Sequence, residues 1–169
     1  TVTLMMNGQS LSFEGASPLY VESGKLIIGD EAVISQPATA SVPAVWVDSN
    51  DQGEDRGTLE FQGKATITGG LFIQNYGKLV GGLKEGTIIT SNGAYSVSVE
   101  QSTETYDNVL GLLGDGLAFA KKDKQTELVN GNVTKLTENV IVVAHTHSIE
   151  EGQSACACGR QFEASVTAE

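Results

Sequence analysis

The chain has 169 residues, long enough for one domain with a core of its own, or for a core with a small appendage. Apolar residues make up 40% of the chain and charged residues only 18%, and the 20 glycines suit a β-rich protein with many tight turns. The net charge of −11 repels phosphate backbones and anionic lipid, which argues against binding of nucleic acid or of a membrane surface.

The chain opens with two alternating apolar segments, residues 1–5 and 10–13, separated by Asn7-Gly8. This dipeptide between alternating segments is a hairpin or turn signal. Because the chain starts at Thr1, without Met or a signal peptide, we interpret it as a processed form or an excised domain.

A short strand pattern then recurs four times. The copies begin at Leu19, Val45, Leu71 and Val97, so each starts 26 residues after the last. Each copy reads apolar, variable, apolar, acidic or amide, and then a small polar or amide residue. A fixed period of about 20–50 residues is typical of repeat architectures.

Further short apolar segments follow the first three copies, with glycines at their ends. Three short strands per repeat with glycine corners predict an all-β fold, a right-handed parallel β-helix (solenoid), over residues 1–101. A β-sandwich is the rival fold, because strands spaced by about 8–12 residues also suggest one.

The repeat stops at residue 102, and residues 102–169 are predicted to form a small α+β cap or companion subdomain. Residues 102–105 offer helix-capping side chains for a short helix over 106–113, with Gly114 as its C-cap. Strands are expected at 117–121, 126–129 and 139–147, and the last of these forms a terminal hairpin with residues 155–166. Such a cap covers the core and the open sheet edges at the end of a repeat array.

Residues 109–119, VLGLLGDGLAF, resemble a segment of large secreted surface proteins of Gram-positive bacteria. There a Leu-Leu-x-x-Gly-Tyr-Ala-Phe motif follows Gly-rich β-helical repeats, and a tail with His-x-His and closely spaced cysteines often comes next. Here Leu117 replaces the usual Tyr, and the cysteines are Cys156 and Cys158 rather than a Cys-x-x-Cys pair. The resemblance implies an extracellular, non-catalytic structural or adhesive module of a larger cell-surface protein, with no catalytic residues to carry over.

The most specific chemical pattern in the sequence consists of two histidines and two cysteines: His145, His147, Cys156 and Cys158. Residues two apart on a strand share a face, so pairing around residues 149–154 would bring all four side chains together. Two Cys and two His are the ligands of a closed, structural zinc site, and we predict one structural Zn²⁺ here. The alternative is a pair of exposed histidines and two free or oxidised thiols.

Tyr20, Trp46 and Phe72 occupy the second position of three successive repeats. Their apolar neighbours would point inward, so the three rings are expected to form an external ladder of the kind that suits sugar rings. The alternative is that residues 102–169 fold over the ladder, because an exposed patch of this size is unfavourable. We expect Trp46 to be covered.

The acidic stretch 48–55 begins like a calcium-binding loop, but its twelfth position would be Leu59 where a bidentate Glu belongs, so we read it as a solvated loop. With two histidines side by side, a Ser-His-Asp site is poorly supported. The adjacent carboxylates Asp30 and Glu31 would face opposite sides of a strand. We therefore expect no enzymatic activity.

The sequence thus predicts a non-catalytic structural or adhesive module, located outside the bacterial cell at its surface or secreted, without membrane insertion. Host or cell-wall glycan, or protein, is the expected partner. The alternatives are a glycan-binding module that uses the aromatic ladder and, last, a polysaccharide-cleaving β-helix enzyme.

Overall fold

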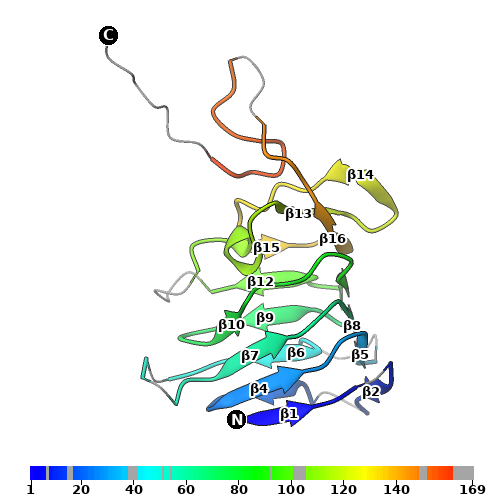
Figure 1. The fold of residues 1–169 in the computed structure, drawn as a ribbon, viewed down its shortest axis with the longest axis vertical. Coiled ribbons are helices and arrows are strands. Elements are labelled where there is room, and N and C mark those ends of the chain that lie inside the picture. The colour runs from blue at the N-terminus through cyan, green and yellow to red at the C-terminus, as the bar shows by residue number, and fades with distance from the viewer. Residues whose placement is uncertain are drawn as a thin grey trace.

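Three β-sheets run through the described part of the chain (Figure 1). The computed structural model describes residues 1–6, 8–14, 17–37, 42–50, 52–53, 55–91, 93–100, 106–148 and 152–161. The four-stranded sheet has the order β1 (Val2–Leu4), β4 (Lys25–Ile28), β7 (Thr58–Phe61), β10 (Lys78–Val80). The five-stranded sheet has the order β15 (Lys135–Leu136), β12 (Val97–Val99), β9 (Leu71–Ile73), β6 (Val45–Val47), β3 (Leu19–Val21). The seven-stranded sheet has the order β14 (Lys124–Leu128), β13 (Leu117–Lys121), β16 (Val140–Ala144), β11 (Ile88–Thr90), β8 (Ala65–Thr68), β5 (Ala32–Ser35), β2 (Ser10–Ser12).

The four copies of the repeated strand are β3, β6, β9 and β12, and they pair in parallel, each with the next. Their third positions are directly opposite one another, and all four are buried: Val21, Val47, Ile73 and Val99. The predicted interior column is therefore confirmed. Strands of the other two sheets pair in the same way, so the first twelve strands visit the three sheets in turn.

The core lies between the three sheets and follows the alternation of side chains along each strand. In β7, Leu59 and Phe61 are buried, whereas Glu60 between them faces outward and pairs with Lys25 of β4 at 2.5 Å. In β8, Ile67 is buried completely while Thr68 is exposed. Because each strand contributes only one or two inward residues, the core depends on the register of every strand.

Two corners between strands require glycine because the backbone of the preceding layer passes too close for a side chain. A Cβ atom at Gly57 would lie 2.1 Å from the carbonyl oxygen of Asp48. At Gly77 it would lie 2.5 Å from the carbonyl oxygen of Val47. These glycines let neighbouring layers approach to the distance that strand pairing demands.

The C-terminal half joins the same sheets with antiparallel strands. β16 pairs antiparallel with β11 and with β13, and β15 pairs antiparallel with β12. Tyr106 attaches this half to β10, because its hydroxyl accepts a hydrogen bond from the Leu79 amide and donates one to the Leu79 carbonyl.

The predicted fold class, a right-handed parallel β-helix with an α+β cap, is wrong. The chain is all-β, but its architecture is three mostly parallel sheets, of which two also contain antiparallel strands from the C-terminal half. No α-helix occurs in the part of the chain that the structure describes. The repeat predicted the parallel neighbours of β3, β6, β9 and β12 correctly. It carries no information on the strands that follow it, and β15 and β16 add to the sheets in the antiparallel direction.

Three local predictions also need correction. The expected helix over 106–113 is only a 3-10 helix, η1 (Val109–Leu112), whose N-cap is Asn108; residues 102–105 lie outside the described ranges. The segments 1–5 and 10–13 contain β1 and β2, which belong to different sheets and form no hairpin; the turn alternative holds, since the Gln9 amide donates to the Met6 carbonyl at 2.7 Å. The strand expected at 139–147 ends at Ala144, and the segment opposite it contributes only a single bridge between Ala155 and Gln161, with residues 162–169 outside the description.

The division of the chain into residues 1–101 and 102–169 stays a prediction. Among the described helices none is long and apolar enough to cross a membrane.

Candidate metal-binding cluster

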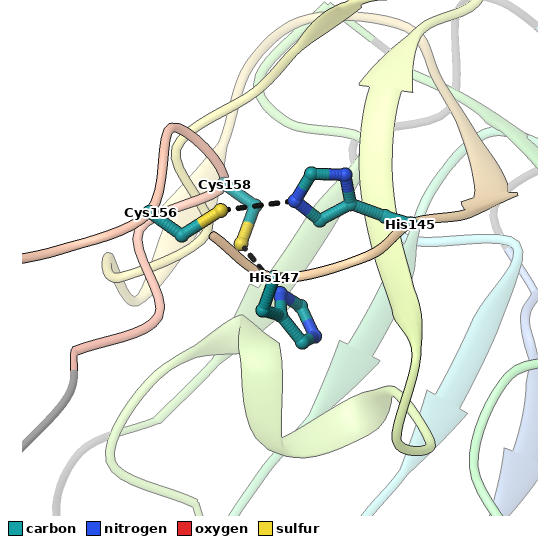
Figure 2. A group of neighbouring side chains, drawn as sticks. All are labelled: His145, His147, Cys156 and Cys158. Carbon is teal, nitrogen blue, oxygen red and sulfur yellow. Dashed lines mark hydrogen bonds between the residues drawn. The ribbon is translucent and has the colours of Figure 1, made fainter. Parts of the chain in front are cut away.

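The two histidines and two cysteines lie together beside the end of β16 (Figure 2). His145 and His147 follow that strand directly, and Cys156 and Cys158 come from the segment 152–161, which folds back against it. One ligand atom from each side chain lies within 4.8 Å of every other. The predicted convergence is confirmed, although it is made by an irregular loop and not by a β-hairpin.

The contacts between the four side chains pair each histidine with one cysteine. His145 Nε2 lies 2.9 Å from Cys156 Sγ, and His147 Nδ1 lies 3.4 Å from Cys158 Sγ. In a tetrahedral site with metal–N of about 2.05 Å and metal–S of about 2.3 Å, neighbouring N and S atoms are about 3.5 Å apart. The two His–Cys distances are close to this value, and the four atoms, all within 4.8 Å of one another, have to draw together to become the corners of such a site.

Tight turns give the cysteine segment its shape. The amide of Cys156 donates to the carbonyl of Arg160 at 2.9 Å, and the amide of Gly159 donates to the carbonyl of Cys156 at 2.8 Å. Gly159 has φ of 93°, a conformation that favours glycine, and a Cβ atom there would lie 2.1 Å from Asn130 Oδ1. A glycine directly after Cys158 is thus needed for both the turn and the close approach to residue 130.

The body of the protein holds this segment at three places. The Gly131 amide donates to the carbonyl of Cys158 at 2.8 Å. Cys156 and Cys158 are buried, and they pack with Ala118 of β13 and Leu128 of β14. Asp115 and Arg160 complete the attachment with an exposed ion pair of 3.4 Å.

The two thiols differ in their electrostatic environment. Burial raises the pKa of both, but at Cys156 hydrogen bonds from the Cys158 amide and from the two histidines outweigh burial and lower the pKa to about 5. Burial raises the pKa of Cys158, and the neighbouring Cys156 raises it further. One cysteine is therefore a thiolate at neutral pH, which is the form that binds a metal.

The two ring nitrogens of His147 lie in different surroundings. Its Nδ1 faces Cys158, while its Nε2 is buried without a hydrogen-bond partner among the described residues. Metal-bound histidines usually donate a hydrogen bond from the nitrogen that does not bind the metal, often to water. Four protein ligands leave no open coordination position, so the arrangement fits a structural role and not the activation of water.

The aromatic side chains form the predicted ladder, and it extends by one ring. The ring centroids are 5.3 Å apart for Tyr20 and Trp46, 5.8 Å for Trp46 and Phe72, and 6.0 Å for Phe72 and Tyr95. Tyr20 is 44% exposed, and the other three rings are half-buried. The C-terminal half reaches the ladder through Lys135, whose Nζ lies 5.1 Å from the centre of the Tyr95 ring.

Two polar groups of the ladder, those of Tyr20 and Trp46, are engaged within the protein. The Tyr20 hydroxyl donates to Asp48 at 2.9 Å, and the Trp46 indole N–H donates to Gln74 Oε1 at 3.1 Å. Burial, with the hydrogen bond to Asp48, raises the pKa of Tyr20 to about 12. Trp46 packs against Tyr20 and Phe72 and is half-buried, and among the described residues of 106–161 the contact with the ladder is that of Lys135 at Tyr95, so the expected cover of Trp46 by this part of the chain is not seen there.

Asp48, the first residue of the stretch interpreted as a solvated loop, is itself buried and accepts from both Tyr20 and Asn75. Two other residues of that stretch, 51 and 54, lie outside the described ranges. Sequence reasoning missed the residues that hold the cysteine segment, namely Asp115, Gly131 and Arg160. Only Gly131 carries a signal, as part of the turn Asn130-Gly131-Asn132.

No known protein family, curated protein sequence or solved structure matches this chain, so the interpretation of the cluster depends on its own geometry and chemistry.

Proposed function

We propose that the chain is a non-catalytic structural module whose C-terminal segment is fastened to the sheets by one structural Zn²⁺. The ligands are His145 Nε2, His147 Nδ1 and the sulfur atoms of Cys156 and Cys158. The observation that carries the proposal is the convergence of these four atoms within 4.8 Å in a chain that contains no other His or Cys.

The donor set favours zinc over the other common metals. Calcium and magnesium prefer oxygen ligands, whereas two thiolates and two imidazoles suit the tetrahedral coordination of Zn²⁺.

The need for a metal also has a physical reason. The cysteine segment buries only the two thiols against Ala118 and Leu128, so its packing contributes little to folding.

The test is metal content and coordination. The 169-residue chain, purified without chelator, should contain about one zinc per molecule by elemental analysis. Replacement by Co²⁺ should give the visible absorption of tetrahedral cobalt with thiolate ligands. The double variant Cys156→Ser, Cys158→Ser should lose both signals.

Asp115→Asn is the matched control, because Asp115 contacts the same segment through Arg160 but offers no ligand to the cluster. This variant should keep one zinc. A wild-type chain that takes up no zinc from solution, or a double variant that retains it, would show that the cluster is not a metal site.

The module belongs, in this proposal, to a larger extracellular bacterial surface protein and has a structural or adhesive role. The support is the resemblance of residues 109–119 and of the His/Cys tail to secreted surface proteins. Glycan binding is the alternative, through Tyr20, Trp46 and Phe72. The four-ring ladder favours it, but the engaged indole N–H of Trp46 and its half-buried ring favour a packing role.

A further inference from the structure

The metal cluster has its two kinds of ligand on two different segments. Both histidines follow β16, and both cysteines lie on the segment 152–161, which folds back against that strand (Figure 2). A Zn²⁺ held by all four side chains therefore joins the two segments, with two bonds to each. A reaction that pairs the two sulfur atoms with each other would remove two ligands from the metal and form no new bond between the segments.

The two sulfur atoms are placed for a disulfide within their own segment. Cys156 and Cys158 lie on one tight turn, which the Gly159 amide closes by donating to the Cys156 carbonyl at 2.8 Å. Two residues apart on a bent chain, their Cα atoms are closer than the limit of about 7 Å for a disulfide. The sulfur atoms lie within 4.8 Å of each other, and the chain has only these two cysteines. Within the molecule, each thiol therefore has the other as its only partner.

Burial selects the oxidant that reaches these sulfur atoms. Cys156 is only 5% exposed, and Cys158 is completely buried. A disulfide such as oxidised glutathione reacts when a thiolate attacks one of its sulfur atoms directly, which requires room for a peptide beside the cysteine. Hydrogen peroxide needs far less room, and it reacts with thiolates, the form in which cysteine binds zinc. The site thus favours a small peroxide over a bulky disulfide.

The other attachments of the cysteine segment that the structure describes are weaker than a metal bridge. They include one backbone hydrogen bond, from the Gly131 amide to the Cys158 carbonyl, and the packing of the two thiols against Ala118 and Leu128. They also include an exposed ion pair at Arg160, and exposed pairs contribute little to stability. Loss of the metal therefore loosens this segment.

We propose that a small peroxide releases the zinc by converting Cys156 and Cys158 into a disulfide, and that the segment 152–161 then detaches from the end of β16. This inference rests on the zinc site of the proposed function and adds its regulation. The disulfide leaves only two imidazoles for the ion, fewer than the four ligands of a closed zinc site. Once the segment is loose, larger thiols reach the disulfide, so reduction and fresh zinc restore the starting state.

The reaction balances with hydrogen peroxide as the oxidant. The thiolate of Cys156, the less deeply buried of the two, attacks one oxygen of the peroxide and becomes a sulfenic acid, with loss of hydroxide. The thiolate of Cys158 then attacks the sulfenic sulfur and displaces a second hydroxide. Two protons from solvent convert both hydroxides to water. The two sulfur atoms give up two electrons, the peroxide accepts them, and Zn²⁺ leaves with its charge unchanged.

The test is peroxide treatment of the zinc-loaded 169-residue chain in the presence of a chromogenic zinc chelator. Zinc should stay bound without peroxide and be released at one ion per chain with it, together with both free thiols. The mass of the chain should fall by two hydrogens. Oxidised glutathione at the same concentration should release zinc far more slowly. The Gly131 amide, which joins the segment to the body, should exchange its hydrogen faster in the oxidised chain. A bulky dithiol reductant with zinc should reverse all of these changes.

The double variant His147→Cys, Cys158→His is the matched control. It keeps two cysteines and two histidines but places one thiol on each segment. The His147 and Cys158 side chains already touch, with Nδ1 and Sγ 3.4 Å apart, so the exchange keeps the cluster together. Peroxide should release zinc from this variant as well, but its disulfide joins the two segments. The Gly131 amide should therefore stay protected.

Several results would overturn the inference. In a zinc-loaded chain these are zinc and thiols that survive peroxide, disulfides between chains in place of the internal one, or zinc release that leaves Gly131 protected. Equally fast release by oxidised glutathione would contradict the selection by burial. Each of these leaves the zinc site itself standing. A chain that takes up no zinc overturns the proposed function and this inference together, and the zinc content measured before peroxide is added separates the two cases.

Discussion

Cys156 and Cys158 show how two chemically identical side chains two residues apart acquire different properties. Both are buried, and burial alone disfavours the thiolate. Cys156 receives hydrogen bonds from the backbone of Cys158 and from the histidines, whereas Cys158 lies next to the charge that this creates. A metal entering the site meets one thiolate already formed and has to displace the proton of the other thiol.

This difference predicts the titration of the metal-free protein. The ultraviolet absorbance of thiolate should appear with a midpoint near pH 5 from Cys156, far below the ordinary thiol value of 9.0. Because the folded pKa lies below the unfolded one, the contribution of this group to stability is complete above about pH 9 and is lost as the pH falls towards 5. Cys158→Ser should keep the low-pH step and Cys156→Ser should lose it. The opposite result would show that the thiolate forms at Cys158 and not at Cys156.

Among the strands, the register of β3, β6, β9 and β12 could be predicted from the sequence because the same short pattern recurs at a constant interval. An inward apolar residue at each third position specifies both the face and the neighbour. β13 and β16 could also be located, since β16 is an apolar run of five residues and β13 an apolar run of four that ends at Lys121. Their antiparallel partners could not be predicted, because no pattern in residues 102–169 relates them to the repeats.

The column of inward residues predicts the cost of a cavity in its centre. Ile73 is 2% exposed and lies between Val47 of β6 and Val99 of β12. Ile73→Ala should lower the free energy of unfolding by about 2–5 kcal/mol, because the layers on both sides limit collapse into the space. Thr68→Ala, on the exposed face of β8, should change it by less than about 0.5 kcal/mol. Denaturant unfolding measures both, and equal effects would contradict the core assignment.

For the molecule as a whole, the candidate site depends on residues that are far apart in the sequence. The convergence of the two histidines and two cysteines could be predicted because His-x-His and Cys-x-Cys place both members of each pair on one side of an extended segment. The attachments at Asp115 and Gly131 could not, because they follow from how η1 and the turn after β14 lie against the cysteine segment. The cluster can therefore form only when the segments that contain Asp115 and Gly131 have folded against the cysteine segment.

Removal of the metal should accordingly loosen one part of the molecule and leave the rest intact. In the zinc-loaded chain treated with chelator, amide hydrogen exchange should increase at Cys156, Gly159 and Gly131, whose bonds hold or shape the cysteine segment. The amides of β6 and β9 should keep their protection, since their partners are the parallel strands on either side. Exchange that rises equally in β9 would show that the metal supports the whole fold.

The antiparallel strands β15 and β16 have a consequence for the order in which the chain is made. As the polypeptide leaves the ribosome, β11 and β12 are synthesised well before residues 135–144, which later cover their outer edges. Until then β11 and β12 of a nascent chain each have an unpaired edge, and such edges are prone to mispair with neighbouring chains. A ribosomal stall or a nonsense codon ahead of Lys135 would therefore release an aggregation-prone fragment and not a shorter protein that is stable by itself.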